Sequence, residues 1–313
     1  MSNPRDAADN YYSAGLGPFY TSRTLSDMFT FIGIIVGVLA TMVGYLMHGG
    51  KIGVLIQVNE FVILGGAGLG IFLGSNGIGV LKQTIAATKG LLKPPPAKQD
   101  YIDMLKMMYQ LFTVARKEGL LGLEKHVEEP ENSDIIKKFP SFLHNHHALN
   151  FFCDTMKVIL TGPVGPHDLS EMMERDLEVA HAEESIPAES LQNVADAMPA
   201  VGIVAAVLGI IITMGKIGGN PAAIGESVGS ALAGTFFGIF AGYIIIGPMA
   251  RSVGSRVRTN GQYLTCIRYA LFSFARGESP ITCVEFARRN VDPSVRPGFV
   301  ELEKAVKEKD IAA

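Results

Sequence analysis

Charge is scarce in this chain of 313 residues. Charged side chains make up 18% of the sequence, whereas soluble proteins average about 25%. Hydrophobic residues make up 48%, and the mean hydropathy is +0.27. The net charge of −3 leaves no basic face of the kind that binds nucleic acid, so no nucleic-acid partner is expected. The composition therefore indicates a protein of the lipid membrane.

Cysteine and the known catalytic motifs are also scarce. The three cysteines (Cys153, Cys266 and Cys283) are an odd number without zinc-type pairing, so we expect no disulfide framework and a reducing compartment. The sequence has no phosphate-binding loop, no dinucleotide fingerprint, and no Ser-His-Asp or HExxH pattern. His144, His146 and His147 lack an acid or cysteine at ligand spacing and favour a solvated surface. We predict no catalytic residue, no metal and no cofactor, and hence no enzyme.

Four uncharged stretches are each long enough to cross a bilayer, which takes roughly 20 apolar residues in a helix. Short loops connect the first stretch to the second and the third to the fourth, so the members of each pair run antiparallel. The sequence predicts an all-α membrane protein with transmembrane hairpins at residues 28–81 and 196–250. The predicted helices are residues 29–50, 60–81, 197–215 and 226–250.

Basic residues predict the orientation of these helices. The short loops contain only Lys51 and Lys216, whereas the opposite side of the membrane carries most of the flanking lysine and arginine (Lys82, Lys89, Lys93, Lys98, Arg251, Arg256 and Arg258). We therefore expect that side, with both termini, to be cytoplasmic. The cytoplasmic parts are then an N-terminal extension (1–27), a helical domain (82–195) and a C-terminal tail (251–313).

Periodicity predicts several helices in the cytoplasmic parts. An amphipathic helix is expected from Tyr101 to Glu118, ending at Gly119. An acidic helix from Asp168 to Asn193 is expected to run back toward the membrane, and the segment FVELEKAVKEK predicts a helix in the tail.

The predicted spans contain no Asp, Glu, Lys or Arg between their flanks, with Glu60 and Lys82 bounding the second span, and the one histidine, His48, lies two residues from the end of the first. Proton pumps and transporters mark their pathways with such residues. If this chain helps to conduct an ion, the titrating carboxylate is expected from a partner helix. Small residues recur at four-residue spacing, which predicts close helix packing. They are Gly33 and Gly37; Gly66, Gly70 and Gly74; Gly202 and Ala206; and Gly234, Gly238 and Gly242.

The third and fourth spans each carry one proline about a turn from a charged flank, Pro199 after Asp196 and Pro248 before Arg251. In an antiparallel pair, this placement predicts that the two prolines lie at the same depth. A proline removes a backbone donor and loosens the preceding turn, which is consistent with a pivot. The alternative is that both are ordinary helix-end prolines.

Several stretches resemble the MotA-type stator subunits of the bacterial flagellar motor. They are GYLMHGGKIGVL, VILGGAGLG, VARKEGLLGLEKHVEEPENS, AEESIPAESLQNVADAMPAVGIVAAVLG, ALAGTFFGIFAGYIIIGPMA and SPITCVEFARRNVDPSVRPGFVELE. These stretches follow the family's order and cover nearly everything from residue 29 to residue 306. The first 27 residues depart from the family, whose members usually begin almost at the first span.

The resemblance implies a homo-oligomer, a pentamer, in the bacterial inner membrane around the membrane helices of a MotB-type partner. The partner supplies a membrane aspartate, and ion passage turns the ring against a FliG-type rotor protein. By motif match, Arg116 and Glu124 correspond to the family's rotor-facing pair, and Asp176 to a further acidic position. Without the resemblance, Arg116 and Glu124 would be read as a solvated helix face. Pro199 and Pro248 match the family's two prolines at the cytoplasmic helix ends.

The resemblance also bears on the coupling ion. Sodium-driven relatives have a threonine in the third span where this chain has Ala206, while both classes keep the hydroxyl that is Thr235 here. Sodium needs several oxygen ligands in place of its water, so one expected oxygen is missing and a proton is favoured. The alternatives are an energiser resembling ExbB and TolQ, which has three spans, and a secondary transporter, which needs a polar site inside the membrane.

Overall fold

The computed structural model describes residues 23–162 and 164–307, and these residues form helices and loops with no β-strand among them. Residues 1–22 of the predicted N-terminal extension lie outside the described residues. The elements are α2 (Arg23–Met47), α3 (Ile52–Leu55), α4 (Val58–Gly90), α5 (Lys98–Glu118), η2 (Leu120–Leu123), α6 (Glu124–Glu128), η3 (Ile136–Lys138), α7 (Pro140–Leu143), α8 (His146–Thr161), α9 (Pro166–Met214), α10 (Pro221–Phe240), the π-helical η4 (Ala241–Ile246), α11 (Gly247–Ala275), α12 (Pro280–Arg289) and α13 (Phe299–Lys307).

Four helices are long and apolar enough to cross a membrane, which confirms the predicted all-α membrane fold. They are Phe29–Met47, Val58–Gly90, Pro166–Met214 and Pro221–Ala275, the last including α10, η4 and α11. The predicted acidic helix and third span are one continuous helix, α9, with Pro187 and Pro199 inside it. Neither proline ends the helix.

The chain forms two compact units, and the division falls within α9 and α11. The globular unit contains Pro94–Glu183 and the chain from Val257 onward. The membrane unit contains Leu25–Lys93 and Glu184–Arg256.

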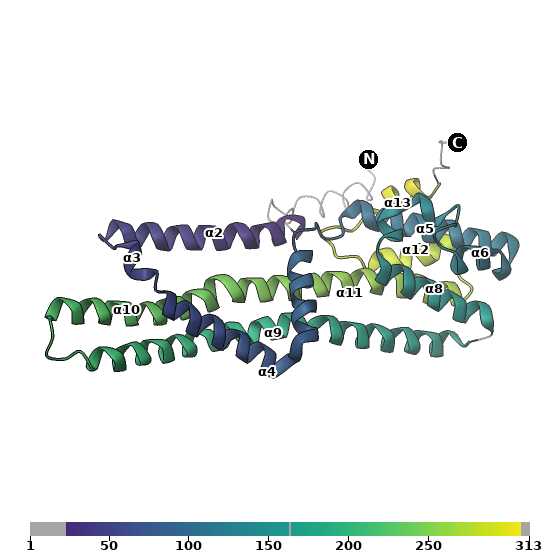
Figure 1. Cartoon of the computed structure of the whole chain (residues 1–313). Coiled ribbons are helices and arrows are strands. Elements are labelled where there is room, and N and C mark those ends of the chain that lie inside the picture. Colours follow the sequence, from purple (N-terminus) through teal and green to yellow (C-terminus); the bar gives the residue numbers. More distant parts are fainter. Residues whose placement is uncertain (1–22, 163, 308–313) are drawn as a thin grey trace, which may run out of the picture. The chain divides into compact units, whose positions relative to one another are not determined.

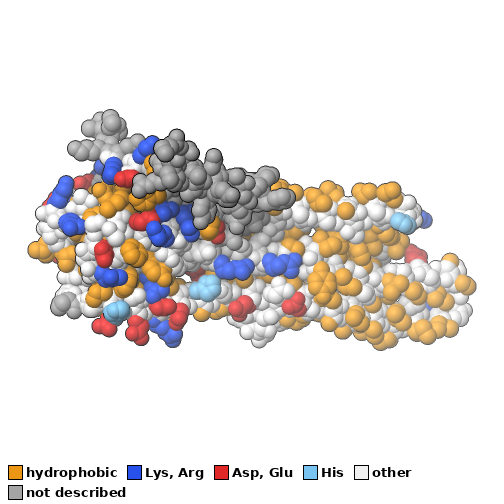
Figure 2. Space-filling view, turned by 180° about the vertical axis from the view of Figure 1, so that it is seen from behind, with side chains coloured by type: hydrophobic (Ala, Val, Ile, Leu, Met, Phe, Trp, Pro, Cys, Tyr) orange, Lys and Arg blue, Asp and Glu red, His pale blue; other side chains and the backbone are white. Residues whose placement is uncertain are grey.

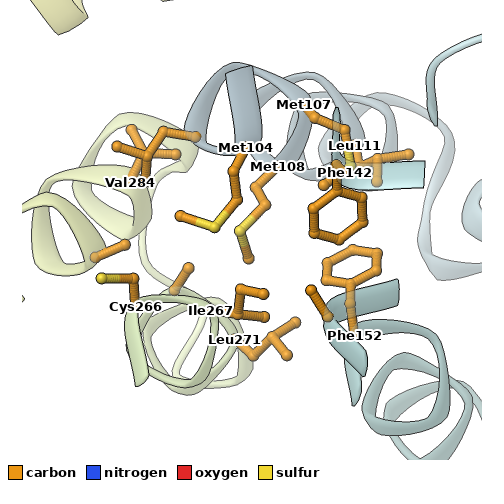
Figure 3. Close-up of a cluster of buried hydrophobic side chains, with 14 of the residues drawn as sticks. Met104, Met107, Met108, Leu111, Phe142, Phe152, Cys266, Ile267, Leu271 and Val284 are labelled. Carbon is orange, nitrogen blue, oxygen red and sulfur yellow. The ribbon is translucent and has the colours of Figure 1, made fainter. Parts of the chain in front are cut away.

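The globular unit is held together by a core rich in methionine and aromatic residues. Figure 3 shows side chains from α5, α7, α8, α11 and α12 meeting in this core. Phe112 on α5 stacks on Phe274 of α11 with ring centroids 4.5 Å apart, and Phe142 meets Phe152 edge to face. Burying an aromatic or methionine side chain stabilises by about 1.5–3 kcal/mol, so these contacts fix the positions of the helices that carry charge on their outer faces.

Local sequence signals set the ends of the helices in this unit. α5 begins after three consecutive prolines, and the Asp100 carboxylate accepts a hydrogen bond from the Ala97 N–H at 2.7 Å. It ends, as the sequence predicts, at Gly119, whose φ of 78° favours glycine. The predicted tail helix is present as α13, and Glu301 in its first turn pairs with Lys98 of α5 at 2.6 Å.

In the membrane unit, α9 and α10 run antiparallel and approach closely through glycine. A methyl group added at Gly202 would lie 2.9 Å from the Gly234 carbonyl oxygen and 3.0 Å from the Gly238 Cα. One added at Gly209 would lie 2.6 Å from the Ala231 Cβ. The predicted close packing is therefore present along this pair of helices (Figure 1).

The other two membrane helices, α2 and α4, pack against α10 and its continuation α11. The Thr30 and Ser252 hydroxyls share a hydrogen bond of 2.5 Å, which connects α2 to α11. Phe61 of α4 lies 4.8 Å from Phe237 of α10, measured between ring centroids. Gly77 interrupts α4 with φ 71° and ψ 177°, and Figure 1 shows the resulting bend. The predicted second span, residues 60–81, is therefore not one straight helix.

Hydrophobic side chains also cover much of the outer surface of the membrane unit (Figure 2). The buried share of the most apolar window ranges from 0% for α2 to 33% for the helix that contains α10. Large apolar side chains of α2, α4 and α9 therefore remain available to lipid or to other chains. Examples are Ile35, Val36, Leu39, Val62, Ile203, Ile211 and Ile212.

Candidate functional site

Arg116 and Glu124 lie close together along the chain on the surface of the globular unit. Arg116 is in the last turn of α5, and Glu124 is the first residue of α6, with η2 between them. Both side chains are exposed, and neither makes an ion pair or hydrogen bond with any residue that the structure describes. Two opposite charges are thus presented to solvent on helices anchored in the core.

Asp176 lies on the part of α9 that belongs to the same unit. Its neighbours are paired, Arg175 with Glu178 at 3.0 Å and Glu174 with Arg268 at 2.7 Å. Asp176 itself is exposed and has no ion pair within the described residues. The structure places Asp176 in the same unit as Arg116 and Glu124, without a contact to either.

The short helix α6 is anchored by a buried histidine two residues after Glu124. His126 is 1% exposed, and its Nδ1 lies 2.8 Å from the Ser133 hydroxyl. That hydroxyl oxygen also accepts hydrogen bonds from the N–H groups of Ile135 and Ile136, so it donates its own proton to a neutral His126. Burial lowers the pKa of His126 more than the nearby Asp134 raises it. The neutral ring therefore stabilises this loop.

Pro248 explains the π-helical segment η4, which sequence reasoning did not predict. Proline has no N–H and its ring clashes with the carbonyl four residues earlier, here that of Ile244. The helix widens just before this point, and the Gly247 N–H donates to the carbonyl of Gly242, five residues back. Such π-helical segments are frequent at functional sites.

Pro199 lies on α9 against the start of this π-helical segment. A methyl group added at Gly242 would lie 3.3 Å from the Pro199 Cδ. Gly242 precedes Pro248 by six residues, which is more than one helical turn. The prediction that the two prolines lie at one depth is therefore wrong. The pairing of α9 with α10 and η4 offsets the two prolines along the helix axes, although both prolines border η4.

Thr235 and Ala206 lie on facing parts of α10 and α9. The Thr235 hydroxyl donates to the Gly202 carbonyl across a long 3.4 Å, and Ala206 is one turn further along α9. Ala206 is 6% exposed, and Ala205 beside it is fully buried. The α9 residues that follow the accepting carbonyl by three and four positions, Ala205 and Ala206, are therefore apolar and buried.

Glu60 is the residue that sequence reasoning missed. The sequence marks it as a charged boundary, but α4 begins at Val58 and the Glu60 side chain is only 5% exposed. Glu60 therefore lies inside α4, in its first turn, rather than at a solvated boundary before the helix. The only available signal was a pair of glycines far along the chain, Gly209 and Gly234, whose lack of side chains makes room for it.

Comparison with known proteins covers both units. The model for the motility protein A N-terminal region matches residues 31–119, and that for the MotA/TolQ/ExbB proton channel family matches residues 145–265. Motility protein A of Salmonella typhimurium is 33% identical over 281 residues, covering 90% of this chain and 95% of its own length. The chain belongs to the motility protein A family. Motility protein A of Escherichia coli is 34% identical with the same coverage.

Solved structures of the motility protein A family share the fold. The structure of C. jejuni MotAB matches with a TM-score of 0.70 and 22% identity, covering 86% of this chain and 98% of that one. The flagellar MotAB stator complex from Bacillus subtilis matches with a TM-score of 0.63 and 21% identity, covering 82% and 92%. Arg116 falls within the matched N-terminal segment of the family, and Asp176 and both prolines fall within the channel segment.

Proposed function

We propose that this chain is the MotA-type stator subunit of a bacterial flagellar motor. In this role it sits in the inner membrane with both termini in the cytoplasm, and with a MotB-type partner it forms a proton channel whose ion flow generates torque. The observation that carries the proposal is the match to motility protein A relatives over 90% of the chain, which includes the globular unit as well as the membrane helices. The chain is thus a channel and motor subunit rather than an enzyme.

The globular unit applies force to a FliG-type rotor protein through Arg116, Glu124 and Asp176. What supports this role is that all three side chains are exposed and unpaired within the described residues. A charge that has no partner in its own chain is available to a charge on another protein. The tightly packed core beneath α5 transmits force with little deformation, because protein interiors have low compressibility.

The membrane unit forms the ion path together with the partner. A single membrane helix with an aspartate, supplied by the MotB-type protein, packs against the exposed apolar faces of α9 and α10, near Ala206 and Thr235. The large outward apolar surface of these helices supports assembly into a ring of identical chains, a pentamer. Pro199 and Pro248 border the widened helix segment and let its packing change as protons pass.

A charge-reversal experiment tests the rotor contact. Arg116→Glu and Glu124→Lys are expected to reduce torque while expression and partner binding stay normal, since substitutions of exposed, unpaired surface residues usually change stability by less than about 0.5 kcal/mol. A matching reversal on the rotor protein is expected to restore motility in part. Lys125→Glu, an exposed charge between Glu124 and His126, serves as a matched control. Normal torque in both mutants, or an equal loss of torque in Lys125→Glu, would contradict the assignment.

A further inference from the structure

Glu60 is a buried acid in the membrane unit. Its side chain is 5% exposed, and its Oε2 is buried without a hydrogen-bond partner among the described residues. The N-cap residue of α4, Gln57, makes no side-chain capping bond, and no reciprocal capping bond involving Glu60 is present there. The position in the first turn of α4 therefore does not by itself explain why this carboxyl group is buried.

The space that Glu60 occupies is made by missing side chains on α9 and α10. A methyl group at Gly234 would collide with the Glu60 Oε2 and would lie 3.0 Å from the Ala205 Cβ. A methyl group at Gly209 would lie 3.8 Å from the Glu60 Oε1. Any larger residue at Gly234 would displace the carboxyl group, so these two helices provide a fitted pocket for an acidic side chain.

No cation on these helices neutralises the carboxyl group. Between Asp196 and Lys216 on α9, and between Glu226 and Arg251 on α10 and its continuation, there is no charged residue and no histidine. Lys51, Lys216 and Glu226 are the charged residues nearest the ends of the packed helices, and all three are exposed, with Lys216 bound to the Ser227 hydroxyl. An unpaired buried carboxylate is costly, so this environment favours a carboxyl group that holds a proton.

The neighbouring hydroxyls are engaged elsewhere. Thr213, one turn beyond Gly209, donates to the Gly209 carbonyl at 2.8 Å, and Thr235, next to Gly234, donates to the Gly202 carbonyl. Neither hydroxyl forms a hydrogen bond with the Glu60 carboxyl group, so the carboxyl oxygens have no donor from these two threonines. A buried carboxyl group without donors is favoured in its neutral, protonated form.

We propose that Glu60 is a proton-binding group of the ion path that this chain itself supplies, in addition to the carboxylate of the partner helix. Gly209 is five residues, or about 7.5 Å, from the end of α9 at Met214, whereas the Thr235–Gly202 contact lies deeper. Glu60 thus stands between the side of the short hairpin loops and the level of Thr235. This inference rests on the proposed function.

Proton transfer through Glu60 conserves atoms and charge in both uptake and release. On uptake, a hydronium ion gives its proton to a carboxylate oxygen of Glu60, so a water molecule is released and the carboxyl O–H bond forms. On release, that O–H bond breaks and the proton passes through water to the carboxylate of the partner helix, where a new O–H bond forms. Glu60 returns to the carboxylate, ready for the next hydronium ion, and nothing is oxidised or reduced.

The test uses the complex of this chain with its MotB-type partner, in wild-type form and as Glu60→Gln, Glu60→Asp and Glu226→Gln. Glu226 is the matched control, because it is an exposed acid near the same end of α10. Infrared spectra recorded across a pH titration detect the C=O stretch of a protonated carboxyl group. Proton flux into vesicles and motor speed in cells provide the functional readouts.

We expect the protonated carboxyl band of the wild type to be absent in Glu60→Gln, shifted in Glu60→Asp and unchanged in Glu226→Gln. Proton flux is expected to fall by about 100-fold in Glu60→Gln, as is typical when a positioned proton-transfer group is lost, and to recover in part in Glu60→Asp. If Glu60→Gln does not bind the partner, the band position and titration in Glu60→Asp decide the question.

Three kinds of result distinguish failure of the inference about Glu60 from failure of the proposed function. Wild-type flux and speed in Glu60→Gln, or an unchanged band in Glu60→Gln or Glu60→Asp, would overturn the inference and leave the proposed function standing. A band that is lost while flux remains normal would make Glu60 a protonated packing group and would also overturn it. Absence of proton-driven rotation in both the wild type and Glu226→Gln would instead overturn the proposed function.

Discussion

Replacing Gly238 with alanine should test the close packing of α9 and α10. The added methyl group would lie 2.6 Å from the Met198 carbonyl oxygen and 2.7 Å from the Gly202 Cα. These are backbone atoms, so they cannot rotate away. Ordinary contact begins at 3.4 Å, so the two helices must separate by about 0.8 Å, the difference between 3.4 and 2.6 Å.

Gly225→Ala is the matched control, because Gly225 lies in the same helix and has no atom within 4 Å of the added methyl position. Alanine stabilises a helix by about 0.5–1 kcal/mol relative to glycine, and both variants receive this gain. Overpacking costs about 1–3 kcal/mol, and only Gly238→Ala incurs that cost. The free energy of unfolding of Gly238→Ala should therefore be about 1–3 kcal/mol below that of Gly225→Ala.

Thermal and denaturant unfolding of the purified complex in detergent measure this difference, with helix content followed by circular dichroism. Copurification of the partner shows whether the helices still assemble. If Gly238→Ala proves as stable as Gly225→Ala, the helices do not approach as closely as described. The reasoning about Gly202 and the Glu60 pocket would then fail with it, because both depend on the same helix pairing.

Three further predictions concern the other features. Because burial lowers the pKa of His126 below its ordinary 6.5, its contribution to stability should be full above pH 6.5 and decline as the pH falls through and below 6.5, and His126→Gln should flatten the pH dependence of the unfolding temperature. Burial raises the pKa of the Cys153 thiol to about 11 and of Cys266 and Cys283 to about 12, so a thiol reagent at pH 7.5 should label them only after unfolding. Pro199→Ala should leave the complex assembled but turning slowly, and normal rotation would exclude a pivot role for this proline.

Hydropathy alone predicts the membrane fold of this chain, because uncharged runs of this length have few other structures available. The end of α5 at Gly119 follows from local sequence as well. The continuity of α9 does not, because Asp196 and Pro199 are typical of a helix boundary, whereas the structure has one helix running through both. The break at Gly77 is equally hidden, since glycine is common in membrane helices.

The candidate site also contains both residues that can be identified from the sequence and a residue that cannot. Exposed charges such as Arg116 and Glu124 stand out only through resemblance, since a charged helix surface is ordinary by composition. Glu60 is hidden for the opposite reason, because a charged residue at the edge of an apolar run resembles a solvated flank. Its burial depends on Gly209 and Gly234, which approach it only after the chain has folded. The offset between Pro199 and Pro248 depends on the same helix register.

The most direct test of the central claim is rotation of single motors in a flagellated host that lacks its own MotA- and MotB-type proteins and instead makes this chain with its partner. We predict that the motors turn, that replacing sodium with potassium at fixed pH leaves their speed unchanged, and that a protonophore stops them. Motors that stay still although the complex reaches the membrane would contradict the stator assignment. Motors that stop without sodium and ignore the protonophore would contradict proton coupling.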